Sequence, residues 1–294
     1  VRECCGDYPA VFGWELGGLE TGADRSIDDV PFAEITRRLC AAYGRGAVNT
    51  VSWHPQNPES GASAWDGKTS TAVSSILPGG ANHAQFRLWL DRLAGFFVGL
   101  KSADGTCVPV LFRPFHEHTG SGFWWGEAQC TPDEYKALWR FTVEYLRDVK
   151  GVHNLLYVYS PDLYRDTERY PGDEWVDVLG LDAYHRPQDW DFLSGGERML
   201  STLQRLGHEH GKPTAFTETG LEGIPDTAWW TRRLLPVIRG KGLSYVLVWR
   251  NAHDRPTHFF GPWHGHASEP DFRKFAANRE QPVLFESQLP DMYH

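Results

Sequence analysis

The stretch VPVLFRPFHE, residues 108–117, joins an apolar, β-branched run to arginine, histidine and glutamate. An apolar run of this length is typical of a strand covered on both faces, because such a strand has no solvent side to keep polar. Six other runs have the same form, and each ends in polar or aromatic residues. They occupy residues 10–16, 47–54, 155–161, 176–184, 213–220 and 245–252.

Helical patterns separate these runs along the chain. The clearest is TPDEYKALWRFTVEYLRDV, residues 131–149, in which Thr131 is the expected N-cap, Pro132 the first helical residue and Glu134 the partner that completes a capping box. Strands that alternate with helices predict an α/β fold with a parallel sheet. Because no linker or low-complexity segment divides the 294 residues, we predict a single domain over residues 1–294, a (β/α)8 TIM barrel.

Composition limits the classes of partner. The net charge is −9, the pI is about 5.8 and no block of lysine and arginine occurs, so we expect no nucleic acid and no anionic membrane surface as partner. The sequence contains no run of 18 apolar residues, so we predict no membrane span. The 13 tryptophans suit a neutral sugar polymer, although we expect most of them in the core. Five cysteines without zinc spacing are as compatible with buried free thiols as with two disulfides.

Ionisable and aromatic groups follow the ends of most predicted strands. In (β/α) barrels the catalytic groups lie at the carboxyl ends of the strands. Two glutamates are placed there, Glu117 after FRPFH and Glu218 within FTETG. Strand alternation would put Arg113 on the same side as Glu117. It would also put Phe216 and Thr214 on the side of Glu218.

The two glutamates admit two interpretations. Two carboxyl groups about 5–5.5 Å apart across a barrel mouth are the arrangement of a retaining glycosidase. One attacks the anomeric carbon, and the other protonates the leaving oxygen and then activates water. The alternative is that Glu117 and Glu218 form ion pairs with Arg113 and Arg250. Spacing alone leaves both interpretations open.

Several motifs in order resemble one enzyme family. RPFHE followed by GSGFWWG, together with GLDAY, FTETG and VWRNA, resembles the motifs of glycoside hydrolase family 26, whose best-known members are endo-β-1,4-mannanases. The resemblance runs from YPAVFGWELG to the terminal LPDMY. It implies a retaining hydrolase of β-mannan, galactomannan or glucomannan that forms a covalent glycosyl-enzyme intermediate. It further implies Glu117 as acid/base, Glu218 as nucleophile, and neither cofactor nor metal.

The same resemblance implies roles for neighbouring residues. His116 is expected to hydrogen-bond the sugar or the nucleophile side of the −1 subsite, and Tyr184 to orient the nucleophile. Asp182 is expected to bind an arginine or the sugar. Five further residues are implied to contact substrate: Trp249 beneath the −1 sugar, Arg250 and His54 at more distal glycone sugars, and Trp124 and Trp125 as the wall of the cleft beside the acid/base. For each aromatic the alternative is a core residue under a loop.

The chain departs from the family pattern after the acid/base. His118 and Thr119 replace methionine and asparagine, and Gly122 replaces an aromatic residue that commonly lines the +1 subsite. Aglycone binding is therefore the least certain part of the resemblance. Two alternatives stay open: a β-glucanase or xylanase of the same mechanism, and a non-catalytic polysaccharide-binding barrel. The presence of both glutamates argues against the second.

The strand count differs from that of a closed barrel. The family places its acid/base after strand 4 and its nucleophile after strand 7, whereas here these glutamates follow the third and sixth runs. By this numbering residues 10–16 are strand 2, residues 245–252 are strand 8, and strand 1 lies upstream of Val1. We expect an extra N-terminal βα unit of about 30 residues in the natural protein. Without it, residues 10–16 and 245–252 should flank a gap of roughly 10 Å.

The expected substrate also predicts where the protein is located. β-Mannan polysaccharides and oligosaccharides are the implied partners, and a polymer of this kind is met outside the cytoplasm. We therefore expect a secreted, periplasmic or cell-surface protein that acts as a monomer. The histidine groups HEH, at 116–118 and 208–210, and HGH, at 264–266, lack the HExxH spacing of a zinc protease.

Overall fold

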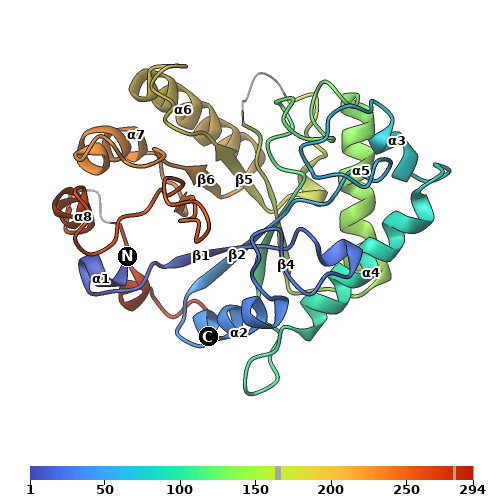
Figure 1. The fold of residues 1–294 in the computed structure, drawn as a ribbon, viewed down its shortest axis with the longest axis horizontal. Helices are drawn as coiled ribbons and strands as arrows, with labels where there is room; N and C mark the ends of the chain where they lie inside the picture. The colour runs from blue at the N-terminus through green and yellow to red at the C-terminus, as the bar shows by residue number, and fades with distance from the viewer. Residues whose placement is uncertain (163–166, 281–282, 294) are drawn as a thin grey trace. The chain divides into compact units, whose positions relative to one another are not determined.

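All seven predicted strands are present in the computed structural model, which describes residues 1–162, 167–280 and 283–293. In the sheet they follow the order of the chain (Figure 1). Every strand lies inside its predicted run and is shorter than the run. The strands are β1 (Val11–Glu15), β2 (Val48–Trp53), β3 (Val110–Pro114), β4 (Leu155–Tyr159), β5 (Val178–Asp182), β6 (Thr214–Thr219) and β7 (Val246–Val248).

Helices occupy the segments between the strands. The predicted capping box is confirmed: Thr131 Oγ1 accepts a hydrogen bond from the Glu134 amide at 3.2 Å, and the Glu134 carboxylate accepts one from the Thr131 amide at 2.8 Å. Two backbone donors at the helix start are thereby satisfied. The α-helices are α1 (Arg2–Cys5), α2 (Phe32–Tyr43), α3 (Ala72–Ile76), α4 (His83–Gly99), α5 (Pro132–Glu144), α6 (Phe192–His210), α7 (Leu235–Ile238) and α8 (Glu269–Ala276).

Contacts group the chain into two compact units, each of which is described by itself. The β2–β4 unit comprises Gly13–Gly44 and Val48–Val178. The β5–β7 unit comprises Val1–Phe12, Arg45–Ala47 and Leu179–His294.

Aromatic residues build the core of the β2–β4 unit. Phe112 of β3 contacts Phe97 of α4 edge-on, with ring centroids 5.0 Å apart, and Tyr157 of β4 at 6.3 Å. Parallel pairing joins β2 to β3 and β3 to β4. Burying one such phenylalanine contributes about 1.5–3 kcal/mol. This packing sets the positions of the carboxyl ends of β3 and β4, where the following loops begin.

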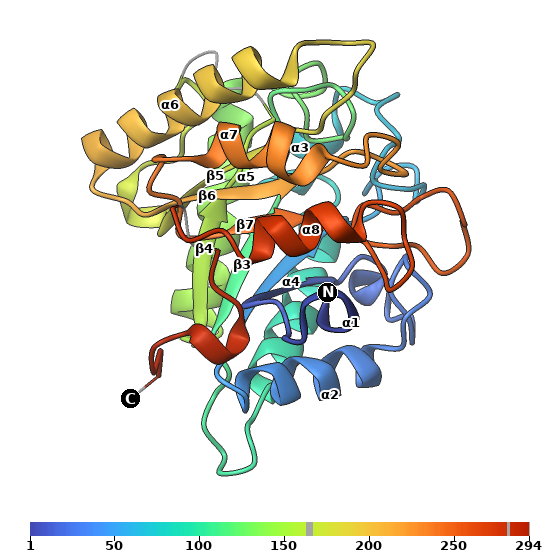
Figure 2. The ribbon, with the colours of Figure 1, turned by 90° about the vertical axis from the view of Figure 1, so that its left-hand side faces the viewer.

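In the β5–β7 unit the helices pack closely on one another. Gly196 of α6 lies so near Val237 of α7 that an added Cβ would stand 3.0 Å from a valine methyl, and Figure 2 shows the two helices together. Trp230 packs edge-on against Phe272 of α8 with ring centroids 4.8 Å apart. Of these helices, α6 also contacts β6.

One residue interrupts the pairing of β5 with β6. Leu181 pairs with Phe216, but Asp182 pairs with Glu218, so that Thr217 has no partner opposite it in β5. An extra residue of this kind breaks strand alternation and redirects the side chains that follow. The predicted grouping of Glu218 with Phe216 and Thr214 by simple alternation is therefore wrong.

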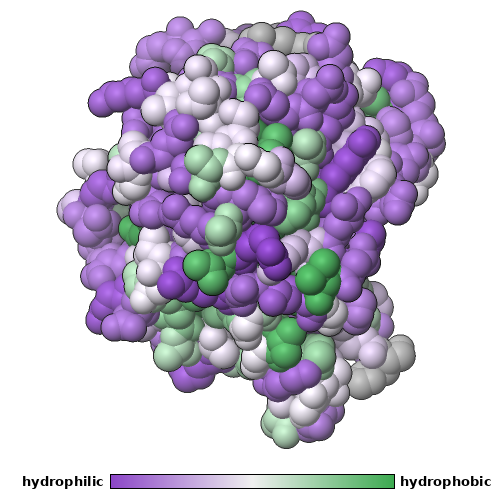
Figure 3. All heavy atoms as spheres, turned by 90° about the vertical axis from the view of Figure 1, so that its right-hand side faces the viewer, coloured by the Kyte–Doolittle hydropathy of each residue, from purple (hydrophilic) through white to green (hydrophobic). Residues whose placement is uncertain are grey.

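One face of the molecule is largely polar. Figure 3 shows a mostly hydrophilic face with scattered apolar residues. Among the residues that the structure describes, no helix is both long enough and apolar enough to cross a bilayer. All five cysteines are free thiols, of which Cys4 and Cys130 are buried and Cys107 is exposed.

Candidate active site

Glu117 lies in a turn beyond the end of β3. Its φ is 52° and that of Phe115 is 48°, both in the left-handed region that residues with a Cβ rarely adopt. Because β3 ends at Pro114, alternation does not extend to Glu117, and the prediction that Arg113 and Glu117 share a strand face is wrong. Non-glycine residues held in this region cost about 1–3 kcal/mol and are concentrated at functional sites.

Surrounding contacts hold the Glu117 turn in place. The Glu117 amide donates to the carbonyl oxygen of Ser160, just after β4, at 2.9 Å. Phe115 is fully buried between aromatic rings, with Trp53 at 5.6 Å between centroids. Its carbonyl accepts a hydrogen bond from the Tyr135 hydroxyl at 2.9 Å. Buried packing and backbone hydrogen bonds thus offset the strained backbone.

His116, the residue before Glu117, is buried. Burial, with a contribution from the Arg113 charge, holds the pKa of His116 well below its ordinary value, so the ring is neutral. Within the described chain its buried Nδ1 has no hydrogen-bond partner. Such an atom is expected to bind water or a ligand group. His116 is therefore suited to donate to or accept from a hydroxyl group, as the sequence predicts, although no contact here tests that role.

Trp124 and Trp125 brace the loop after Glu117 from inside. Both side chains are fully buried, and their indole NH groups donate to the carbonyls of Pro55 at 2.9 Å and His116 at 2.8 Å. Neither tryptophan offers a face to a sugar. The prediction that they form the wall of the cleft is contradicted, and the alternative of core residues under a loop holds for both.

His54 is paired with an acidic residue that the sequence did not single out. Its Nδ1 lies 2.7 Å from Oε2 of Glu15, which also accepts from the Ser52 hydroxyl at 2.7 Å. Burial acts to raise the pKa of Glu15, but the His54 charge and hydrogen bonds from His54, Ser52 and Gly17 outweigh it and lower the pKa to about 2. A buried carboxylate is thus kept ionised beside His54.

Trp65 lies over His54 on the surface. It is 55% exposed, and its ring stacks on the His54 ring with centroids 5.2 Å apart and planes 22° apart. Phe123 adjoins both rings, at 5.7 Å from Trp65 and 5.3 Å from His54. Sequence reasoning missed Trp65 because it lies in a long loop rich in glycine and serine. A lone tryptophan in such a polar segment is the signal that could have identified it.

Glu218 is held by neighbours within the β5–β7 unit. The Tyr184 hydroxyl donates to Oε2 of Glu218 at 2.5 Å, as the sequence predicts for an orienting phenol. Asp182 and Glu218 each place a carboxylate oxygen within 4.8 Å of the other. The Thr217 hydroxyl donates to Oδ1 of Asp182 at 2.6 Å. The extra residue in β6 therefore both redirects the strand end and supplies a hydrogen bond to its acidic neighbour.

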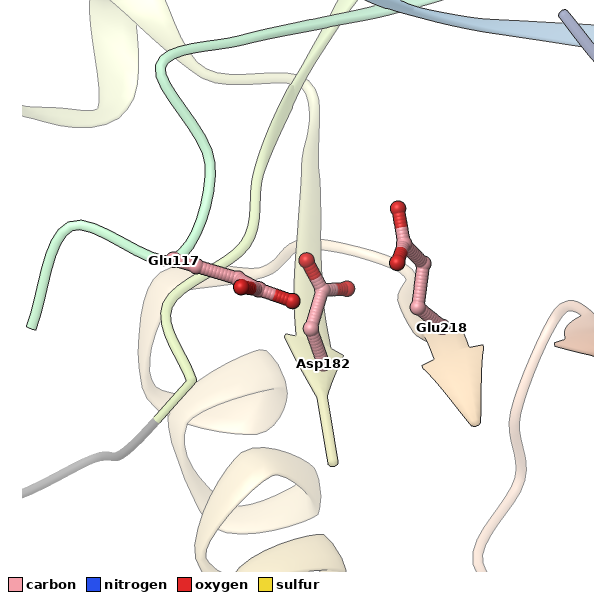
Figure 4. A group of neighbouring side chains, drawn as sticks. All are labelled: Glu117, Asp182 and Glu218. Carbon is pink, nitrogen blue, oxygen red and sulfur yellow. The ribbon is translucent and has the colours of Figure 1, made fainter. Parts of the chain in front are cut away.

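Figure 4 draws these two carboxylates together with that of Glu117, which extends from the turn after β3. Carboxylate oxygens can bind hard cations. Hydroxyl donors from Tyr184 and Thr217 already engage one oxygen of Glu218 and one of Asp182. These two hydrogen bonds orient the Glu218 and Asp182 carboxylates at the ends of β6 and β5.

Trp249 and Arg250 follow β7 directly and are partly exposed. The Trp249 amide donates to the carbonyl of Thr219, next to Glu218, at 3.0 Å. This bond places Trp249 beside the end of β6. The exposure of both residues suits the predicted contacts with sugars, which stay predictions.

Comparison with known proteins identifies the class. The model of glycosyl hydrolase family 26 matches residues 1–196. A mannan endo-1,4-β-mannosidase of Bifidobacterium adolescentis is 35% identical, over 94% of this chain and 30% of its own length. One from Bacillus subtilis strain 168 is 32% identical, over 78% of this chain and 61% of its own length. The chain thus spans less than two thirds of either relative.

Solved structures of family 26 enzymes are also similar to this chain. A GH26 β-mannanase from Bacteroides ovatus is 44% identical with a TM-score of 0.93, covering 100% of this chain and 87% of that one. A modular endo-β-1,4-mannanase from Cellulomonas fimi is 38% identical with a TM-score of 0.87, covering 99% and 68%. The chain belongs to glycosyl hydrolase family 26. The predicted α/β fold of the TIM-barrel class is thereby confirmed.

Proposed function

We propose that this chain is the catalytic part of a retaining endo-β-1,4-mannanase, with Glu218 as nucleophile and Glu117 as acid/base. Membership of the family and the names of the relatives support the reaction class. The observation that carries the assignment of roles is the hydrogen bond from Tyr184 to Glu218 at 2.5 Å. It orients the Glu218 carboxylate, as a carboxylate nucleophile requires.

The reaction proceeds in two displacements. Glu218 attacks the anomeric carbon while Glu117 gives its proton to the departing glycosidic oxygen, and a glycosyl ester forms on Glu218. Glu117, now ionised, takes a proton from water, and this water displaces Glu218 with a second inversion. The product keeps the β configuration. The strained, well-anchored turn at Glu117 supplies the fixed position that proton transfer requires.

The aromatic surface supports a neutral polysaccharide as substrate. Trp65 presents an exposed ring above His54, and the partly exposed Trp249 follows β7. Sugar rings stack on such faces through their axial C–H groups, and a chain with net charge −9 offers no general attraction for anionic polymers. We infer that β-1,4-linked mannan, galactomannan or glucomannan binds there, with His116 and Arg250 contacting hydroxyl groups.

The substrate also supports a place and a state for the protein. A polysaccharide of this size is degraded outside the cytoplasm, so we infer a secreted, periplasmic or cell-surface enzyme. One cleft in one chain suffices for the chemistry, so we infer a monomer.

Product analysis tests the proposed activity. The purified protein is incubated with galactomannan, glucomannan, barley β-glucan and xylan, and the products are separated by chain length. We expect a ladder of mannooligosaccharides from the first two polymers at early times. Release of glucan or xylan fragments alone would assign the substrate to the alternative of the same mechanism. Absence of cleavage on all four would leave only a binding function.

A further inference from the structure

An aromatic ring from a distant loop supports the tyrosine that binds Glu218. Phe260, in the loop between β7 and α8, packs edge-on against Tyr184 with ring centroids 5.5 Å apart. Phe260 is 6% exposed. Tyr184 is held at its backbone, where its carbonyl accepts a hydrogen bond from the Trp190 indole at 3.0 Å. This bond holds the backbone of Tyr184, whereas the contact with Phe260 acts on the ring that carries the hydroxyl.

Phe260 packs directly against the end of β6. Gly220, two residues after Glu218, has φ +150°, and a Cβ built there would stand 2.5 Å from Cδ1 of Phe260. The carbonyl of Gly220 also accepts a hydrogen bond from the His185 amide at 2.9 Å, next to Tyr184. Phe260 is therefore confined between the β6 end and the tyrosine ring.

Asn251 fixes the backbone that carries Phe260. Its side-chain oxygen accepts hydrogen bonds from the amides of Phe260 at 3.0 Å and Gly261 at 2.9 Å. Its side-chain nitrogen donates to the Gly261 carbonyl at 2.8 Å. These three hydrogen bonds from one side-chain amide thus go to two adjacent residues. Asn251 follows Arg250 directly. The segment after β7 that carries the predicted sugar contacts therefore also positions the backbone of Phe260.

We propose that Asn251 and Phe260 are positioning residues that hold the Tyr184 hydroxyl on the Glu218 carboxylate. This inference rests on the proposed function, in which Glu218 is the nucleophile. Phe260 closes one side of the Tyr184 ring, and Asn251 keeps Phe260 from moving away. A displacement of about 1 Å at a reacting group can cost 100-fold in rate. Because this role acts through Tyr184 and not through substrate contact, its loss appears in the rate of the first displacement rather than in binding.

A double-mutant cycle tests the proposal. The variants are Phe260→Ala, Tyr184→Phe and the two combined, and the measured quantity is the rate of glycosyl-enzyme formation from an aryl β-mannobioside with an activated leaving group. We expect Phe260→Ala to lower this rate about tenfold with little change in KM, and Tyr184→Phe to lower it by about 10–100-fold. In the Tyr184→Phe background, Phe260→Ala should have no further effect. Independent, multiplying losses would overturn the proposal, since Phe260 would then act by another route.

Matched variants separate positioning from general damage. Phe259→Ala removes the adjacent ring, which contacts Trp263 and His266 instead of Tyr184, and should leave the rate unchanged. Phe260→Leu keeps bulk beside Tyr184 and should restore most of the rate. If Phe260→Ala fails to fold, Phe260→Leu and Asn251→Ser carry the same cycle. Asn251→Ser should show a smaller loss that also disappears in the Tyr184→Phe background; a loss that persists there would contradict its role.

Failure of this inference is distinguishable from failure of the proposed function. If Glu218→Ala retains the wild-type rate, Glu218 is not the nucleophile and the proposed function fails. If Glu218→Ala is inactive while Phe260→Ala and Tyr184→Phe multiply, the function stands and only the positioning role fails.

Discussion

At the scale of single residues, the strained backbone of Glu117 and the tyrosine bond of Glu218 single out two carboxyl groups for different tasks. Glu117→Ala should lose most activity on polymer, about a thousandfold or ~4 kcal/mol of barrier, because a poor leaving group needs a proton. Substrates with activated leaving groups should be spared in the first step. Azide should restore turnover by taking the place of activated water, and β-mannosyl azide should accumulate. Wild-type activity of Glu117→Ala on polymer would show that the acid/base lies elsewhere.

The pair of Glu15 and His54 gives a prediction on pH. The folded pKa of Glu15, about 2, lies below its ordinary value of 4.5. The stabilisation is therefore complete above pH 4.5 and is lost as the pH falls toward 2. The difference corresponds to roughly 3 kcal/mol at neutral pH. Glu15→Gln should lower the free energy of unfolding by about this amount at pH 7 and by much less near pH 3.

A surface carboxylate provides the control for Glu15. Hydrogen bonds from Arg37 and Arg38 lower the pKa of Glu34 to about 2 as well, but solvent screens this pair. Glu34→Gln should leave the free energy of unfolding nearly unchanged, measured by urea titration at each pH. An equal loss in both variants, or a Glu15→Gln loss that does not vary with pH, would show that burial gives Glu15 no special role.

Sequence reasoning reached some residues and missed others for physical reasons. Tyr184 was identified because its GLDAY motif resembles that of the family, and its position in the sequence alone would not have assigned it a role. Trp124 and Trp125 were misjudged because a loop can fold a tryptophan inward as readily as outward, and nothing in FWWG distinguishes the two. Trp65 was missed because the sequence of its loop likewise does not show that this tryptophan faces outward. Burial of loop aromatics depends on contacts from other parts of the chain, such as the Pro55 carbonyl that holds Trp124.

At the scale of elements, the loop after Glu117 has room at Gly122, where the resemblance to the family leads us to expect an aromatic residue. Gly122 is exposed, and a Cβ built on it meets nothing within 4 Å. Gly122→Trp should therefore fold normally and add a stacking face beside the leaving group. We expect kcat/KM on short mannooligosaccharides to rise by up to about tenfold, the scale of one contact of about 1 kcal/mol. Long substrates, which bind elsewhere as well, should change less.

The control for this change is Gly122→Ala, which adds bulk without a stacking face. It should leave kcat/KM unchanged on both short and long substrates. No gain in Gly122→Trp would mean that another loop already lines the aglycone side.

The strands were predictable because apolar runs and strand ends follow from burial alone. The extra residue at Thr217 was not, since the local sequence FTETG fits a regular strand equally well. Only pairing with β5 shows that Asp182 meets Glu218 rather than Thr217. Likewise, the sequence FRPFHE does not predict that β3 ends at its proline. Nor does it predict that Phe115 and Glu117 adopt left-handed backbone conformations.

At the scale of the whole molecule, the order of motifs fixed the family, and the likeness to the Bacteroides ovatus β-mannanase extends over 100% of the chain. Seven strands follow the order β1 to β7, which agrees with the seven runs in the sequence. The expected additional βα unit before Val1 stays a prediction, as does the gap between residues 10–16 and 245–252. A single catalytic domain over residues 1–294 is likewise an expectation. Substrate choice depends on loop surfaces, which composition does not specify.

The central claim is that Glu218 forms a covalent bond with the sugar. In a 2-deoxy-2-fluoro β-mannobiosyl fluoride, the 2-fluoro group slows both displacements while the fluoride leaving group speeds the first, so the glycosyl-enzyme accumulates. Intact mass spectrometry should show one added fluoroglycosyl group, and peptide mapping should place it on Glu218 within FTETG. Glu218→Ala should take up no label, while Glu117→Ala should still become labelled because fluoride leaves without a proton. Label on any other residue, or no label while the enzyme turns over polymer, would contradict the retaining mechanism assigned to Glu218.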